Sequence, residues 1–69
     1  MEEAPIKGLE RFVGQEVEVI VKDGRKFRGK MIQVDEHTNI ILEEAEELDT
    51  HRKHKLIFLK GGNVLEILL

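Results

Sequence analysis

The sequence predicts a small all-β fold, a bent five-stranded antiparallel barrel preceded by a short α-helix. Three observations predict it. Apolar and polar residues alternate after Gly14, Asp23-Gly24 is a hairpin signal, and residues 60–63 carry a second turn signal. Residues 1–69 are expected to form a single domain, because a chain of this length has room for one core.

Residues 5–13 are expected to form the helix. Pro5 suits a first helical turn, and apolar residues recur after it at helical spacing. Gly14 follows the last of them, at a position where helices commonly end. A helix this short is stable only when its apolar face docks on the rest of the protein.

The first two strands are predicted around the Asp23-Gly24 turn. Valine occupies every second position from 17 to 21, alternating with Glu18 and Ile20, which predicts a strand with one face mostly buried. The turn is expected to be type I′, with positive φ at both central positions. A second strand is predicted over residues 26–34. Its apolar residues change face along the strand, and Gly29 in its interior indicates a sharp bend.

The rest of the chain is divided by polar segments. Residues 49–54 contain no apolar residue and are expected to form an exposed loop. The glycines of the second turn are expected to supply positive φ. The remaining elements are predicted as a turn at residues 35–38, strands at residues 40–47, 56–59 and 64–69, and a turn at residues 60–63.

The last two predicted strands are apolar on almost every position. Strands that are apolar on both faces need cover on both faces, and an exposed apolar edge strand would aggregate. The chain has no cysteine, so disulfides cannot supply the stability that a domain of 69 residues usually lacks. Pairing of edges between neighbouring copies, repeated head to tail into a ring, satisfies both requirements.

At this point the sequence resembles the Sm/LSm family, and most of all its archaeal Sm-like members. The resemblance covers nearly the whole chain and rests on two motifs in order. The first runs over residues 17–42 and includes Asp23-Gly24-Arg25, Phe27, Gly29, Val34-Asp35, His37, Asn39-Ile40 and Leu42. The second is Phe58-Leu59-Lys60-Gly61-Gly62-Asn63-Val64, followed by Ile67.

The resemblance implies an Sm-like, SH3-like barrel and rings of six or seven subunits, in which the fourth strand of one copy pairs with the fifth strand of the next. It implies a non-catalytic cytoplasmic protein that binds single-stranded, uridine-rich RNA in RNA processing or turnover. No cofactor is expected. The alternative is a structural or protein-interaction ring of the same fold with little affinity for RNA.

Carried over by position, the resemblance also implies an RNA-binding site. His37 would stack on a base, and Asn39 would hydrogen-bond to the edge of that base. Asp35 would brace the loop, while Lys60 would lie on the other side of the base with the Gly61 backbone beside it. Stacking contributes roughly 1–3 kcal/mol per base, and an amide offers both a donor and an acceptor to uracil.

Two departures from the family pattern weaken the expected uridine preference. Arginine is common where this chain has Lys60, and a lysine ammonium does not stack on a base as a guanidinium does. An acidic residue is frequent where this chain has Gly62. These departures, together with a net charge of −3, motivate the alternative of a ring that scarcely binds RNA.

Other charged groups have simpler interpretations. His51 and His54 have a spacing that could hold a metal, but histidines on a polar loop are usually solvated, so no metal site is expected. The acidic residues between positions 43 and 47 are interpreted as a solvated surface rather than as a catalytic pair. Arg25 could contact phosphate, but a solvated charge or an ion pair at a subunit interface is the preferred interpretation. No apolar run approaches the length of a membrane span.

Overall fold

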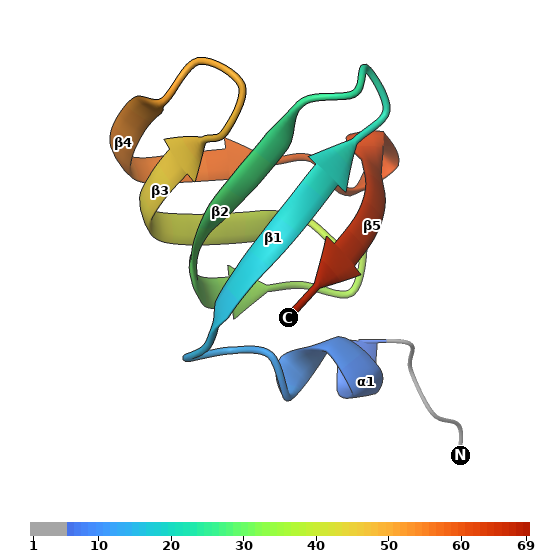
Figure 1. Ribbon diagram of the computed structural model, residues 1–69. Coiled ribbons are helices and arrows are strands. Elements are labelled where there is room, and N and C mark those ends of the chain that lie inside the picture. Colours follow the sequence, from blue (N-terminus) through green and yellow to red (C-terminus); the bar gives the residue numbers. More distant parts are fainter. Residues whose placement is uncertain (1–5) are drawn as a thin grey trace.

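The structure, a computed structural model, describes residues 6–69 and contains a short helix and five antiparallel strands (Figure 1). The strands lie in the order β4-β3-β2-β1-β5. The elements are α1 (Ile6–Glu10), β1 (Glu16–Val21), β2 (Lys26–Val34), β3 (Ile40–Glu47), β4 (Arg52–Leu59), a 3₁₀-helix (Gly61–Asn63) and β5 (Val64–Leu68). The predicted fold class is confirmed.

The helix ends at Glu10, earlier than predicted. Beyond it the N–H of Phe12 donates to the carbonyl three residues earlier, at 2.9 Å, which is turn rather than α-helical geometry. Gly14 has a φ of +93°, and its N–H donates to the Met31 carbonyl at 2.7 Å, so the chain turns here to enter the sheet. The predicted start at Pro5 lies outside the described residues.

The first hairpin lies where it was predicted, but its turn is not type I′. Gly24 has a φ of +98°, whereas Asp23 has no positive φ. The Gly24 N–H donates to the Val21 carbonyl at 2.8 Å, and the Val21 N–H donates to the Arg25 carbonyl at 3.0 Å. This pattern matches a three-residue hairpin loop in which a glycine in the left-handed region follows an ordinary turn. The prediction of positive φ at both positions was therefore wrong.

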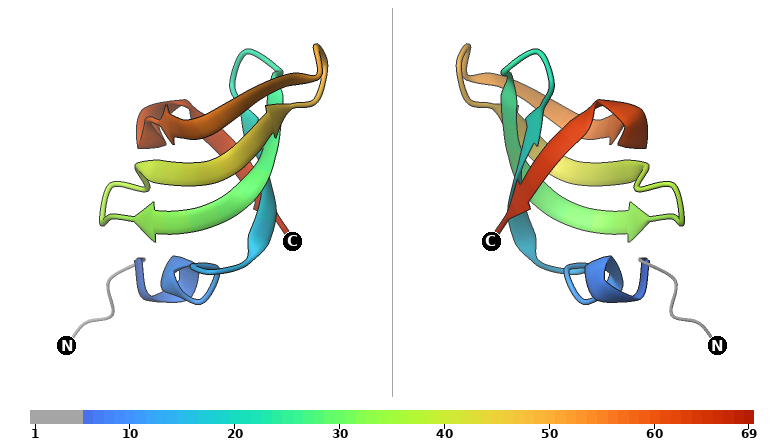
Figure 2. Two further views of the ribbon diagram at one scale, coloured as in Figure 1. Left: turned by 90° about the vertical axis from the view of Figure 1, so that its left-hand side faces the viewer. Right: turned by 90° about the vertical axis from the view of Figure 1, so that its right-hand side faces the viewer.

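The predicted bend at Gly29 is confirmed by the pairing of β2 with β3. The register shifts between Arg28 and Lys30, so that Glu44 and Ala45 of β3 together face Gly29. A bulge of this kind bends a strand and increases its twist. A Cβ at Gly29 would lie 3.0 Å from the Ala45 Cα, so glycine permits the close approach. Figure 2 shows the resulting strong curvature of the sheet.

A second register shift explains why the apolar residues of β2 change face. It falls between Met31 and Gln33 and leaves Ile32 without a cross-strand partner on β3. Ile32 is 38% exposed, while Val34 turns back to pack against the core. Residues two positions apart share a face in a regular strand, so the bulge is what separates Ile32 from Val34.

The prediction of a loop over residues 49–54 was wrong for its second half, because β4 already begins at Arg52. Lys53 pairs across the strands with Glu46, and Arg52 pairs with Glu47. Opposite charges facing each other on neighbouring strands stabilise a sheet without any apolar residue. The absence of apolar residues was therefore a poor indicator of a loop here.

The two edge strands of the sheet are β4 and β5, and they do not pair with each other within the chain. Three large apolar side chains on these edges are more than half exposed: Leu56, Phe58 and Leu65. The buried apolar core consists of Val17, Val19, Val21, Phe27, Met31, Ile40, Leu42, Ala45 and Leu59. Over the described residues, no helix has the length and apolar character that crossing a membrane would require.

Candidate nucleic-acid interface

The two motifs of the sequence meet at one end of the molecule, where the β2–β3 turn contacts the segment between β4 and β5. The Gly61 N–H donates to the Asn39 Oδ1 at 2.7 Å, although these residues are far apart in the chain. We call the residues of this contact, Asp35–Asn39 with Lys60 and Gly61, the motif junction. Antiparallel pairing brings them together, because Leu59 at the end of β4 lies opposite Ile40 at the start of β3.

Asp35 organises the β2–β3 turn. Its Oδ1 accepts hydrogen bonds from the backbone N–H groups of His37 (2.8 Å) and Asn39 (2.9 Å), and its Oδ2 accepts one from the Asn39 Nδ2 (2.9 Å). Thr38 adopts a left-handed φ of +64° inside the turn. A short acidic side chain that bonds to backbone groups a few residues ahead is a typical way to hold such a turn. The predicted bracing role of Asp35 is thus matched by its geometry.

These bonds favour the ionised form of the carboxylate. The side-chain amide of Asn39, followed by the backbone N–H groups of Asn39 and His37, lowers the pKa of Asp35 below its ordinary value. Asp35 is consequently ionised at neutral pH, and the carboxylate accepts all three hydrogen bonds.

Gly61 is required for space rather than for its φ. A Cβ at this position would overlap the His37 carbonyl oxygen, whereas a Cβ at Gly62 would meet nothing within 4 Å. Neither glycine has a positive φ, and the segment Gly61–Asn63 is a 3₁₀-helix. The prediction of a turn here was right, but the reason given for its glycines was wrong.

Asn39 connects the two halves of the junction through its side-chain amide. Its Oδ1 accepts from Gly61 and its Nδ2 donates to Asp35, which fixes the orientation of the amide. A carboxamide has two donor hydrogens and two acceptor lone pairs. One N–H and one lone pair therefore remain to contact a ligand.

The side chains of His37 and Lys60 flank this fixed centre and, over the described residues, make no hydrogen bond to it. The His37 side chain is 76% exposed, and its Nε2 lies 3.7 Å from the Glu36 carboxylate. Lys60 is exposed and immediately precedes Gly61. Hydrogen bonds thus join Asp35, Asn39 and Gly61 directly. The side chains of His37 and Lys60 lie beside these three residues because His37 and Lys60 are their neighbours in the sequence.

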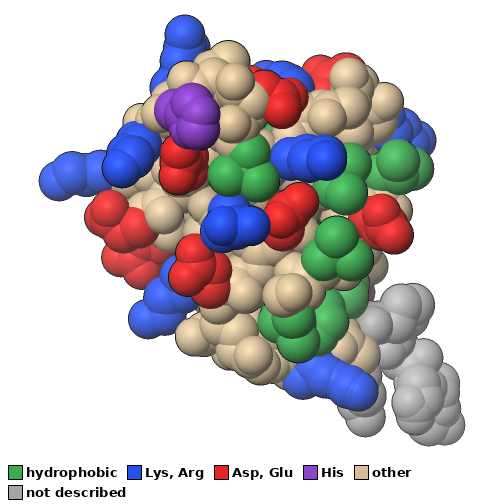
Figure 3. Space-filling view, in the orientation of Figure 1, with side chains coloured by type: hydrophobic (Ala, Val, Ile, Leu, Met, Phe, Trp, Pro, Cys, Tyr) green, Lys and Arg blue, Asp and Glu red, His purple; other side chains and the backbone are tan. Residues whose placement is uncertain are grey.

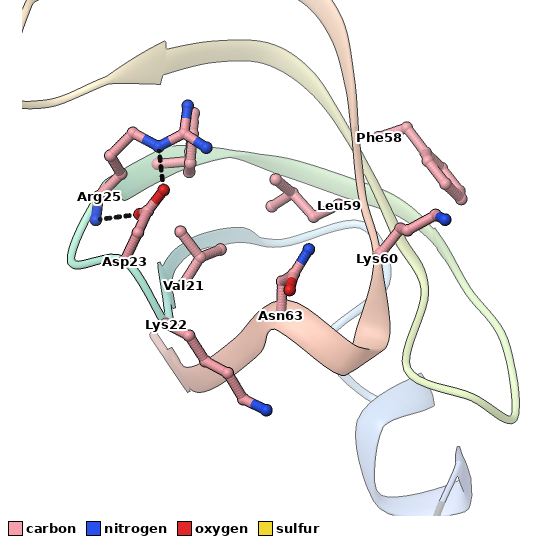
Figure 4. Close-up of a pocket in the computed structure, with 9 residues that line it drawn as sticks. Val21, Lys22, Asp23, Arg25, Phe58, Leu59, Lys60 and Asn63 are labelled. Carbon is pink, nitrogen blue, oxygen red and sulfur yellow. Dashed lines mark hydrogen bonds and ion pairs between the residues drawn. The ribbon is translucent and has the colours of Figure 1, made fainter.

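A cavity of about 320 Å³ lies on the other side of Lys60, between the β1–β2 turn and the end of β4 (Figure 4). It contains residues that the sequence reasoning missed, including Lys22, whose backbone N–H donates to the Asn63 carbonyl at 2.8 Å. Arg25 also lines it, but its Nε is 2.9 Å from the Asp23 carboxylate. Arg25 therefore has an ion-pair partner within its own turn, whereas the ion pair that the sequence suggested would have lain at a subunit interface. Only the fold could reveal this cavity, since its walls come from distant segments.

The histidines of the β3–β4 hairpin do not form a metal centre with their neighbours. His51 lies at a left-handed φ of +61°, with its Nδ1 3.0 Å from the Glu46 carboxylate. His54 lies on β4, opposite Ala45. Over the part of the chain that the structure describes, no three His, Asp or Glu side chains are grouped for a metal ion.

The chain has relatives among known proteins. A family model of the LSM domain matches residues 7–69. The chain is 40% identical over 70 residues to the snRNP Sm-like protein of Thermococcus onnurineus, a match that covers 97% of this chain and 90% of that protein.

Solved structures of Sm proteins share the fold. The Sm protein of Pyrococcus abyssi, solved in complex with a uridine heptamer, has a TM-score of 0.84 and 35% identity, covering 96% of this chain and 97% of that one. A heptameric archaeal Sm protein has a TM-score of 0.81 and 33% identity, covering 90% of this chain and 94% of that one. The chain belongs to the LSM family, within which it is similar to archaeal Sm-like proteins.

Proposed function

We propose that this protein forms a ring of six or seven identical copies that holds single-stranded, uridine-rich RNA and catalyses no reaction. The observation that carries the proposal is the motif junction, in which Asn39 is oriented by both Asp35 and Gly61. A relative of 35% identity was solved with a uridine heptamer, and another relative is a heptamer. Both facts support the proposal for this chain.

The two edges of the sheet support assembly. Leu56 and Phe58 on β4 are 60% and 57% exposed, and Leu65 on β5 is 63% exposed. Because the exposed edges are different strands, a contact between them is head to tail and is repeated by every added copy until the ring closes. Antiparallel pairing between copies would cover the apolar side chains and satisfy the edge hydrogen bonds together.

At each junction the proposed roles follow from the chemistry. The exposed imidazole of His37 offers a flat face for a base, and the remaining N–H and lone pair of Asn39 can match the adjacent carbonyl and N–H of uracil. Lys60 supplies a positive charge for the backbone or the base edge. Single-stranded RNA exposes the base edges that a duplex hides.

The charge of the assembly limits affinity at any one site. Seven copies of net charge −3 would carry about −21, and such a field repels RNA. Binding then depends on one strand engaging several equivalent junctions, which raises the effective concentration at each further site. We propose a scaffold role in RNA processing or turnover, in the cytoplasm, for a ring with these properties.

Native mass spectrometry with and without a uridine oligomer tests the ring and the ligand together. We expect a single closed oligomer that takes up oligo-uridine at low salt, as followed in parallel by fluorescence titration. The combined substitution His37→Ala and Asn39→Ala should abolish saturable binding while the ring remains. Binding untouched by this pair would eliminate the pocket. A ring with no saturable binding would favour the structural alternative, which Lys60, Gly62 and the negative charge motivate.

A further inference from the structure

Glu66 is an exposed acidic residue with no basic residue opposite it on the neighbouring strand. Acidic and basic side chains intermingle on the face of the molecule seen in Figure 3. On β1 and β2, for example, Glu18 and Arg28 form an ion pair at 3.2 Å. Glu66 is the one charged residue of β5, is exposed, and lies opposite Ile20. In the described part of the chain it has no ion-pair partner.

Lys60 occupies a corresponding position at the other edge of the sheet. Its backbone is extended (φ −74°, ψ 136°), so its side chain continues the alternation of β4 and lies on the same side as Phe58. Figure 4 shows Phe58 and Lys60 pointing to one side of the chain and Leu59 to the other. The ammonium of Lys60 likewise has no ion-pair partner among the residues that the structure describes.

Pairing of the two edges brings these charges together. In an antiparallel contact between β4 of one copy and β5 of the next, core-facing residues must face each other, as must outer ones. Ile67 faces the core, and so do Ile57 and Leu59. The register that sets Ile57 opposite Ile67 puts Glu66 diagonal to Lys60. The register that sets Leu59 opposite Ile67 puts Glu66 directly opposite Lys60.

Both registers keep the charges within reach of each other. Side chains directly opposite on antiparallel strands have Cβ atoms about 5 Å apart, and diagonal neighbours lie about 7–8 Å apart, which a lysine side chain spans. The same registers set apolar outer residues together: Leu68 faces Leu56 in the first and Phe58 in the second. The charged pair and the apolar contacts thus both indicate that the partner of each sheet edge is a second copy of this chain.

We infer that the Glu66 carboxylate of one copy forms an ion pair with the Lys60 ammonium of the next, so that each RNA site contains a residue of its neighbour. The inference rests on the proposed ring and on the proposed role of Lys60. RNA that approaches the junction competes with Glu66 for the same ammonium. Glu66 therefore lowers the affinity for RNA through Lys60, in addition to its effect on the overall field.

A double-mutant cycle separates these two effects. Glu66→Gln should tighten binding of oligo-uridine about two- to fivefold at low salt, the range expected from losing one exposed ion pair. The charge control is Asp49→Asn, which removes one negative charge from the β3–β4 loop. When Lys60→Met is already present, Glu66→Gln should change the affinity for oligo-uridine no more than Asp49→Asn does. Equal tightening by Glu66→Gln in both backgrounds would overturn the inference, as would no tightening at all.

Cross-linking tests the placement without RNA. The chain has no cysteine, so K60C together with E66C introduces the two thiols of interest alone. A short bis-maleimide linker should convert this variant into a ladder of covalent oligomers, whereas K60C with D49C should give none. If the variant with K60C and E66C forms a ring but gives no cross-linked oligomers, the inference is overturned and the proposed function is left intact. An unmodified protein that forms no ring contradicts the proposed function itself.

Discussion

The motif junction and the sheet edges differ in whether their groups find partners within one copy of the chain. At the junction each polar group finds its partner within one copy: Asp35 accepts three hydrogen bonds, and Asn39 joins Gly61 to Asp35. At the edges, Leu56 and Phe58 remain more than half exposed. The comparison teaches that contacts within one chain complete the motif junction, whereas the proposed repetition of nucleotide sites would depend on association between copies.

The two regions also respond differently to conditions. The junction depends on hydrogen bonds within one chain, each contributing about 0.5–1.5 kcal/mol, so its geometry should not change with protein concentration. The proposed contacts at the edges depend on burial of apolar area between copies, which contributes roughly 25 cal/mol per Å². The fraction of associated copies should therefore rise with protein concentration. The predictions below separate the two regions.

The largest effect is expected from Gly61→Ala. The new Cβ would overlap the His37 carbonyl oxygen, so the junction must open at a cost of at least about 3 kcal/mol. The control is Gly62→Ala, where a Cβ meets open space and the effect should be small. Urea unfolding at one fixed protein concentration measures both. Similar midpoints for the two variants would contradict the close packing at Gly61.

Asn39→Ala is expected to cost about 1–3 kcal/mol, because it leaves the Gly61 N–H without a partner and removes one bond from Asp35. His37→Ala should leave stability nearly unchanged, since that side chain is exposed. Thermal unfolding of the two variants side by side makes the comparison. If His37→Ala destabilised the fold as much as Asn39→Ala, the proposed division between a fixed centre and a free stacking face would fail.

At the edges, Leu56→Ser should weaken association without unfolding the chain. Covering a leucine that is 60% exposed contributes about 1–2 kcal/mol per contact, and every contact of the ring loses it. Ile32→Ser provides the control, because Ile32 is 38% exposed but lies on β2, away from both edges. Sedimentation over a dilution series should show dissociation of the first variant at higher concentration. Equal dissociation of both would mean that β4 is not the contact.

The smallest effect concerns pH. Hydrogen bonds lower the pKa of Asp35 in the folded protein, so its contribution is present above its unfolded pKa of about 4 and is lost as pH falls through the lower folded value. Acid unfolding followed between about pH 5 and pH 2 should therefore be less steep for Asp35→Asn than for the unmodified chain. Glu10→Gln, an exposed carboxyl on α1, is the control. Identical acid curves for the Asp35 variant and the unmodified chain would refute the linkage.

The sequence by itself determined much of the fold. The strand predicted over residues 26–34 agrees with β2 residue for residue, and the bend at Gly29 is present. Alternation of side chains and turn residues are local signals, so they can be seen without the fold. The five site residues could be proposed because the two family motifs are contiguous segments, and the structure joins Asp35, Asn39 and Gly61 by hydrogen bonds. Their roles toward RNA stay predictions.

Only the tertiary structure decided the features that depend on contacts between distant segments. Arg52 and Lys53 belong to a strand because two acidic residues of β3, Glu47 and Glu46, face them. The polarity of the segment alone does not reveal these partners. Gly61 is required because the His37 carbonyl lies beside it, not because its φ is positive. The physical reason is the same in both cases: local propensity shows what a segment prefers, but a residue's available space and partners depend on which other segment the folded sheet places against it.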